Sequence, residues 1–413
     1  MAIVINQEPN NIAAVYGYLP YAVSSNRILN PQFQYVMDIK SGSNVLARIR
    51  QYPNPAGDAI FDPSQILSDF LEYPTHNFDG GSQVEVPQQV QNFTIAFGEE
   101  YGNSISSSVA VYNGNDVLGN PGVSGSNTPL IAIPAQVDYQ GVSTSGWNFN
   151  ATGSGKNFAL GEWYSNYPSQ SLNAANVDAN TKRYIDFNDT GFLQIPISGS
   201  DTVGVDYKLF NSSNVQQGST ISKTVSPSDT CMVSSPIGPY QVGFSQTNWD
   251  NSSYMRIEGP NNNLYLYKDE ETCYYDRFQI QFINRVGGLE WYGISLPTQQ
   301  NSQVKRETYT KPFLPWSNTT AVYNQMQRGK EIYNVSKTDT ISITTPYLDQ
   351  AESQWLEQIF DSPAVWINPG PNKNFWKPVI VSTNSFVRNV NKRGQKLFQY
   401  TFEFEYSNVN AGR

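Results

Sequence analysis

The sequence predicts a mainly β protein, with two or three β-sandwich-like or barrel-like domains and two short amphipathic helices. Aromatic residues make up 13% of the 413 residues, with 26 Tyr and 21 Phe among them. Such side chains suit a pleated, half-buried surface. Asn, Ser, Thr and Gln fill much of the remainder, and together with 30 Gly and 25 Pro they supply turns. We therefore expect many short strands separated by polar turns.

Residues 1–101 form the first predicted domain, and it contains a hairpin. Apolar residues alternate from Phe33 to Ile39 and again from Val45 to Ile49. The turn Ser41-Gly42-Ser43-Asn44 lies between the two runs, as expected for two antiparallel strands. A further strand is predicted over 93–97.

The same domain contains the clearest helix signal, over residues 62–73. Asp62 can cap the helix start and Pro63 can occupy its first position. Apolar residues then recur at three- and four-residue spacing, and Pro74 ends the pattern.

Residues 102–230 form a second region that is rich in Gly, Ser, Asn and Thr. This composition is typical of a second β-sandwich or of a long decorated insertion, parts of which could become ordered only against a partner. A low-complexity linker is the competing interpretation, but repeated aromatic clusters favour a folded core. Short apolar clusters lie at 130–133, 184–187, 192–197 and 203–210.

Residues 231–413 form the third predicted domain, with a hairpin and a second helix. Apolar residues alternate from Phe278 to Phe282, Gly287-Gly288 offers a positive-φ turn, and Leu289 starts the return strand. The second helix is predicted over 346–361, with Thr345 as its cap and an apolar face that includes Trp355.

The chain finishes in a predicted hairpin, with one strand over 379–387 and a turn over 391–394. Its last strand places five aromatic residues on one face. Such a face must be covered by a sheet, a helix or another subunit. The helix that carries Trp355 is the natural cover within the chain, and another subunit is the alternative. The candidate interface residues are Phe398, Tyr400, Phe402, Phe404 and Tyr406.

The net charge disfavours two classes of partner, and the cysteine count disfavours a disulfide-bonded fold. The formal net charge of −9 disfavours binding to nucleic acid or to an anionic membrane, since both require a basic face. Two cysteines, Cys231 and Cys273, are too few for a disulfide scaffold, so we expect two free or buried thiols. We also expect neither a signal peptide nor a membrane span.

We find no residue pattern that predicts catalysis, a cofactor or a bound metal. The single histidine, His76, has no nucleophile motif beside it and is interpreted as a surface-loop residue. A phosphate loop at 153–157 fails because Asn150 and Asn157 stand where the motif needs Gly and Ser or Thr. A calcium loop beginning at Asp186 fails because Ile197 replaces the closing Glu. We therefore expect a protein that is not an enzyme.

Carbohydrate recognition is the alternative that the middle region leaves open. Adjacent acids such as Glu99-Glu100 could serve a glycosidase, although such pairs are commoner on solvated turns. Aromatic side chains could stack on sugars, although core or subunit packing is the commoner role. The candidate glycan-facing residues are Trp147, Trp163, Tyr164 and Tyr167.

Several segments together resemble a family of virion proteins from tailed phages of Bacteroidetes and related marine bacteria. They cover roughly half of the chain, in its first and last parts, and none is a catalytic signature. The segments are Phe33-Gln-Tyr35, Leu46-Ala-Arg-Ile-Arg50, Tyr52-Pro-Asn-Pro-Ala-Gly57, Phe61-Asp-Pro-Ser-Gln-Ile-Leu67, Phe97-Gly-Glu-Glu-Tyr101, Phe282-Ile-Asn-Arg-Val-Gly-Gly288, Ser362-Pro-Ala-Val-Trp366, Pro378-Val-Ile-Val381 and Gly394-Gln-Lys-Leu-Phe-Gln-Tyr-Thr-Phe-Glu-Phe404.

The resemblance implies a virion component that is assembled in the host bacterial cytoplasm, with tail-hub, baseplate or adaptor roles favoured. Its expected partners are other virion structural proteins and copies of itself, in a ring or trimer. A head-associated decoration or vertex protein is one alternative. A carbohydrate-binding or carbohydrate-active protein that faces a host surface glycan is the other.

Overall fold

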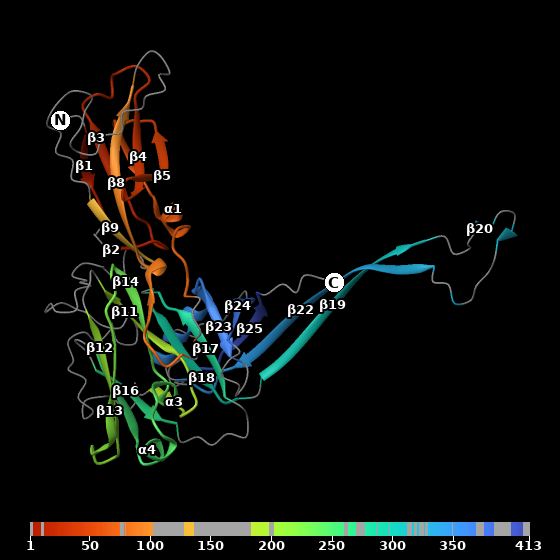
Figure 1. Cartoon of the computed structure of the whole chain (residues 1–413). Coiled ribbons are helices and arrows are strands. Elements are labelled where there is room, and N and C mark those ends of the chain that lie inside the picture. The colour runs from red at the N-terminus through yellow and green to blue at the C-terminus, as the bar shows by residue number, and fades with distance from the viewer. Residues whose placement is uncertain are drawn as a thin grey trace, which may run out of the picture.

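The computed structural model confirms the mainly β fold class, because strands dominate it and its helices are few and short. Three large hydrophobic cores follow one another along the chain. A long ribbon of two strands projects from the C-terminal part (Figure 1). The structure describes residues 3–9, 12–74, 78, 80–101, 128–135, 183–197, 202–259, 263–269, 277–285, 287–296, 298–311, 316–317, 320–321, 326, 329–348, 350–368, 376–383 and 398–407.

The N-terminal core lies between two sheets that share one hydrophobic cluster. Tyr21 of one sheet and Tyr35, Met37 and Phe93 of the other are fully buried in it. The three-stranded sheet has the order β1 (Ile3–Gln7), β3 (Tyr21–Ser25), β6 (Asp58–Phe61), and the five-stranded sheet has the order β2 (Ile12–Ala14), β9 (Thr128–Ile133), β8 (Gln91–Glu100), β4 (Gln34–Ser41), β5 (Asn44–Gln51).

The predicted hairpin of this core is confirmed, with one local difference. β4 and β5 pair in antiparallel fashion around Gly42, which has a φ of 57°. A register shift between Ile39 and Lys40 sets Val45 opposite Lys40. Because a bulge turns the following side chains to the other face, Val45 is exposed and does not lie on the apolar face as predicted.

The predicted helix over 62–73 is shorter in the structure, where α1 spans only Ser64–Ser68. Asp62 does bind the helix start, since its Oδ1 accepts a hydrogen bond from the backbone N–H of Ser64 at 3.0 Å. Further along, the N–H of Glu72 donates to the carbonyl of Gln88 and not to a helical partner. After Ser68 the chain makes only tight turns, with the N–H groups of Phe70 and Leu71 donating three residues back, and the tertiary bond at Glu72 then ends the helical path.

The middle core also lies between two sheets, and Tyr207, Trp249 and Met255 are buried in it. One sheet has the order β10 (Arg183–Ile185), β16 (Asn263–Lys268), β15 (Tyr254–Glu258), β12 (Val203–Phe210), β13 (Gln216–Val225). In this sheet β12 and β13, which precede residue 230, pair with β15 and β16, which follow it. The sheet therefore crosses the predicted boundary between the second region and the third domain. The other has the order β11 (Phe192–Ile197), β14 (Cys231–Pro236), β7 (Val84–Val86), and the short helices η1 (Pro87–Gln89), α3 (Pro239–Val242) and α4 (Gln246–Asp250) complete the unit.

The C-terminal core packs one face of a seven-stranded sheet against two short helices, α5 (Gln350–Leu356) and α6 (Gln358–Asp361). The predicted hairpin around Gly287 is confirmed, and that glycine has a φ of 88°. The sheet has the order β18 (Leu289–Ile294), β17 (Phe278–Ile283), β23 (Val365–Asn368), β24 (Lys377–Val381), β25 (Thr401–Tyr406), β22 (Lys330–Thr344), β19 (Thr298–Thr310). A separate pair, β20 (Trp316–Ser317) and β21 (Thr320–Ala321), lies at the far end of the ribbon (Figure 1).

The second helix was predicted over 346–361, but it starts later and is broken. Thr345 does not cap it, because its Oγ1 accepts the N–H of Tyr400 at 2.9 Å. Leu348 forms a β-bridge with Phe398, which keeps the chain extended up to that point. The helix is also interrupted at Glu357, whose carboxylate accepts the Tyr400 hydroxyl at 2.8 Å.

The last hairpin is confirmed as an antiparallel pair of β24 and β25. β24 ends at Val381, six residues before the predicted end of the strand. The predicted turn over 391–394 lies outside the described residues. Among the residues that the structure describes, no helix has the length and hydropathy that crossing a membrane requires.

Candidate interaction surface

The five aromatic residues predicted as an interface lie mainly inside the chain. Tyr400, Phe402 and Phe404 are buried, whereas Phe398 and Tyr406 are partly buried. The cover is the helical segment that carries Trp355, and the ring of Phe360 lies 4.8 Å from that of Phe402. The expected intramolecular cover is thus confirmed. As a correction to the proposed interface, the buried rings hold the C-terminal core together and offer no aromatic face to a neighbouring subunit.

The other singled-out residues are either buried or outside the described part of the chain. The four glycan-facing candidates (Trp147, Trp163, Tyr164 and Tyr167), together with His76 and Cys273, lie outside the described residues. Cys231 is a free, buried thiol, and burial raises its pKa to about 12. A thiol with so high a pKa is unreactive at neutral pH.

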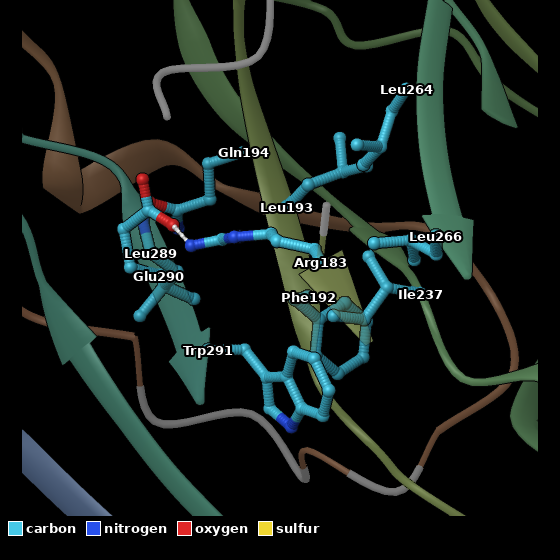
Figure 2. Close-up of a pocket in the computed structure, with 10 residues that line it drawn as sticks. All are labelled: Arg183, Phe192, Leu193, Gln194, Ile237, Leu264, Leu266, Leu289, Glu290 and Trp291. Atoms are coloured by element: carbon cyan, nitrogen blue, oxygen red, sulfur yellow. Dashed lines mark hydrogen bonds and ion pairs between the residues drawn. The ribbon is translucent and has the colours of Figure 1, made fainter. Parts of the chain in front are cut away.

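A small cavity lies between the middle core and β18 (Figure 2). Arg183 crosses it and pairs with Glu290 at 2.7 Å, and Trp291 and Phe192 line its other end. Its free space holds about one water molecule, so it cannot admit an organic substrate. Nor do the described residues contain three metal-ligating side chains gathered at one place.

Buried polar side chains connect the middle and C-terminal cores. Gln89 of η1 and Gln194 of β11 exchange amide hydrogen bonds of 2.8 and 2.6 Å. Gln89 also donates to the carbonyl of Gly287, in the turn after β17, at 3.1 Å. Because unpaired polar groups are costly to bury, these contacts fix one arrangement of the cores.

The ion pair of Asp189 and Arg277 is the charged part of this junction. The Arg277 Nε lies 3.0 Å from Oδ2 of Asp189, and the guanidinium also pairs with Asp269. Gln279 donates to the other Asp189 oxygen at 2.7 Å. Burial raises the pKa of Asp189 to about 6, while the charge of Arg277 opposes that rise. All these groups bind each other within the chain, which is typical of a structural network.

Within the described part of the chain, the ribbon of β19 and β22 is a long element that no other strand or helix covers over most of its length. β22 pairs with β25 only over Thr340–Thr344, and its remaining residues pair with β19 alone. The ribbon therefore leaves the sheet and extends away from the cores (Figure 1). Its free part spans about ten residues per strand, or ~30 Å at the usual rise of a strand. Both strands are exposed along most of this length.

One side of the ribbon, here called the aliphatic face, continues the core side of the sheet. Side chains alternate along a strand, and directly opposed residues share a face. Ile341 and Ile343 are buried in the C-terminal core, and the same face continues outward through Lys337 and Val335. Ile332, which is 51% exposed, lies on it beyond the register shift that follows Glu307. One carboxylate, Asp339, lies on this face and pairs with Lys337 at 2.8 Å. The aliphatic face consists of Ser302, Val304, Arg306, Thr308, Thr310, Lys330, Ile332, Val335, Lys337 and Asp339.

The opposite side, here called the tyrosine face, satisfies its polar groups locally. The rings of Tyr309 and Tyr333 lie 6.2 Å apart. Tyr309 donates to Glu331 at 2.8 Å, and this hydrogen bond raises the pKa of its phenol. Glu331 also pairs with Lys311, and Glu307 accepts a hydrogen bond from Asn334 at 3.2 Å.

The charge of the ribbon is opposite to that of the rest of the chain. The two ribbon strands contain four basic and three acidic side chains, a net charge of +1, and residues 298–344, which include the segment between the strands, contain six basic and three acidic side chains, a net charge of +3. The other residues contain 20 basic and 32 acidic side chains, a net charge of −12. A basic, exposed ribbon on an acidic protein is suited to contact an acidic surface.

Comparison with known proteins assigns the chain to no family. No family model matches the sequence, and a search of curated proteins also finds no match. The functional interpretation therefore depends on the residues of this chain and on their geometry.

Proposed function

We propose that this chain is a structural component of a bacteriophage virion, a tail, baseplate or tail-hub protein that assembles with copies of itself and with neighbouring virion proteins. We further propose that it is not an enzyme. The observation that carries the proposal is the projecting ribbon of β19 and β22, whose free part has no cover within the described chain.

The physical reason is that a two-stranded ribbon alone is marginally stable in water, since it buries little apolar surface. It also exposes Val304, Ile332 and Val335 together on one face. Docking on another molecule would bury these side chains and pair the free strand edges. Extended arms of this kind are expected in proteins whose task is to connect subunits.

The virion assignment within this class is supported by the segments that resemble phage virion proteins. Two of them, Phe282-Ile-Asn-Arg-Val-Gly-Gly288 and Pro378-Val-Ile-Val381, lie in the sheet from which the ribbon projects. A head-associated protein would use the same physics, and only its position in the particle would differ.

The experiment is to purify the full chain, measure its mass by light scattering and image any oligomer by electron microscopy. A shortened variant would join Ser302 to Asp339, which pair across the ribbon, through an Asn-Gly turn. We expect the full chain to form a closed ring or trimer and the shortened chain to remain a folded monomer. A full chain that stays monomeric at high concentration would count against self-assembly.

A further inference from the structure

We propose that the aliphatic face of the ribbon docks on the outer face of β24 and β25 in a second copy of this chain. The inference rests on the proposed function, since it names the surface and the partner through which the chain self-assembles.

The donor surface combines aliphatic and basic side chains. Val304, Ile332 and Val335 supply exposed apolar area, and Arg306 and Lys330 flank them on the same face. Neither of these two basic residues has a carboxylate partner among the described residues. Their charges are therefore available for an acidic partner surface.

The acceptor surface is the side of the seven-stranded sheet that faces away from α5 and α6. Phe402 and Phe404 point into the core, so Glu403 and Glu405 point outward. Ile380 lies directly opposite Glu405 on β24 and is 60% exposed. On the other side Glu405 faces Thr340, and Glu403 faces Ser342, both in β22. The result is an exposed aliphatic side chain beside two carboxylates, with small polar residues around them.

The two surfaces are similar in polarity and opposite in charge. Each has exposed aliphatic area, and the unpaired charges are basic on the ribbon and acidic on the sheet. The carboxylates of Glu403 and Glu405 form no ion pair with a described residue. Bringing the surfaces together would pair both sets of charges at the rim of a small apolar contact.

A second copy is favoured as the partner because every chain carries both surfaces. Residues 298–344 have a net charge of +3 and the remaining chain has −12, so copies attract through unlike parts. The donor and acceptor surfaces are different, and such a head-to-tail contact generates a ring if the rotation closes. The reach of the ribbon, ~30 Å, is enough to extend beyond its own core to a neighbour.

Charge exchange tests the pairing. Self-association would be measured by light scattering for the wild type, for R306E/K330E, for E403K/E405K and for the fourfold variant that combines them. We expect each double variant to raise the dissociation constant at least about tenfold, and the fourfold variant to recover most of the affinity. Lys305→Glu is the control, because it reverses an exposed charge on the tyrosine face. Circular dichroism would verify that each variant is folded.

Each other outcome would overturn the inference in a distinct way. If R306E/K330E weakens association but E403K/E405K does not, the ribbon docks on another surface. If the wild type assembles and neither double variant weakens it, assembly uses a different contact and only this inference fails. If the wild type does not assemble at all, the proposed self-assembly fails with it.

Discussion

Two regions of the molecule are rich in polar residues: the buried junction between the cores, and the projecting ribbon. The junction buries and pairs its polar side chains, whereas the ribbon leaves many of them exposed. At the junction, Gln89, Gln194 and Asp189 are buried and bind other parts of the same chain. On the ribbon, Arg306 and Lys330 are exposed, and their face has no cover within the described residues. The junction thus satisfies these polar groups within the chain, whereas the ribbon has the composition of a surface that requires a partner.

The largest expected effect follows from placing a charge in the C-terminal core. Phe402 is fully buried beneath Phe360. Phe402→Asp would bury a carboxylate without a partner, and we expect it to cost at least about 4 kcal/mol and to prevent folding. Urea denaturation would measure this, with Glu403→Ala, the exposed neighbour, as the control. A folded variant that only fails to assemble would show that the ring belongs to an interface.

A slightly smaller loss of folding stability is expected at the junction. Arg277→Met would leave Asp189 buried without its cation, at an expected cost of about 3–5 kcal/mol. The control is Arg50→Met, which breaks a more exposed pair with Glu100 and should cost at most about 1 kcal/mol. Equal unfolding free energies for the two variants would contradict the difference between buried and exposed pairs.

The junction should also make stability depend on pH. The folded-state pKa of Asp189 is raised to about 6, above the ordinary carboxyl value. Its stabilising contribution is therefore present below about pH 4 and is lost as the pH rises through about 6. We expect the melting temperature of the wild type to fall relative to that of Asp189→Asn between pH 4 and pH 7. If the melting temperatures of the two proteins change equally with pH, Asp189 is not the source of the pH dependence.

The smallest effect on stability is expected on the ribbon. Ile341 and Ile332 lie on the same face, but Ile341 is under the helices and Ile332 is 51% exposed. Ile341→Ala should cost about 2–5 kcal/mol, as is usual for a buried isoleucine. Ile332→Ala should cost within about 0.5 kcal/mol and should instead weaken self-association. Thermal unfolding and light scattering would separate the two effects.

Sequence patterns located the strands that bury one face but missed the ribbon. The hairpins at Gly42 and Gly287 were predictable because alternating apolar residues flank a glycine-containing turn. No element was predicted between the hairpin at Gly287 and Thr345, because both faces of the ribbon are polar enough to erase a two-residue hydrophobic period. The alternation of Ile341 and Ile343 was the one local signal, and it marks only the covered base.

The wrong start predicted for the second helix and the wrong interface proposed at the aromatic face have the same physical cause. The second helix begins later than predicted because Leu348 pairs with Phe398, fifty residues further along the chain. The aromatic face of the last strand was recognised correctly, but its pattern does not say whether a helix or a subunit covers it. Contacts between distant segments decided both cases, and a single sequence does not display such contacts.

The most direct test of the central claim is hydrogen exchange on the full chain, compared at concentrations below and above assembly. Strand β12, deep in the middle core, serves as the internal reference. We expect the amides of the free part of the ribbon, residues 302–310 and 330–339, to exchange quickly in the monomer and to become protected on assembly, while β12 stays unchanged. Ribbon amides that exchange equally fast in the monomer and in the assembly would contradict the role of the ribbon as the docking surface.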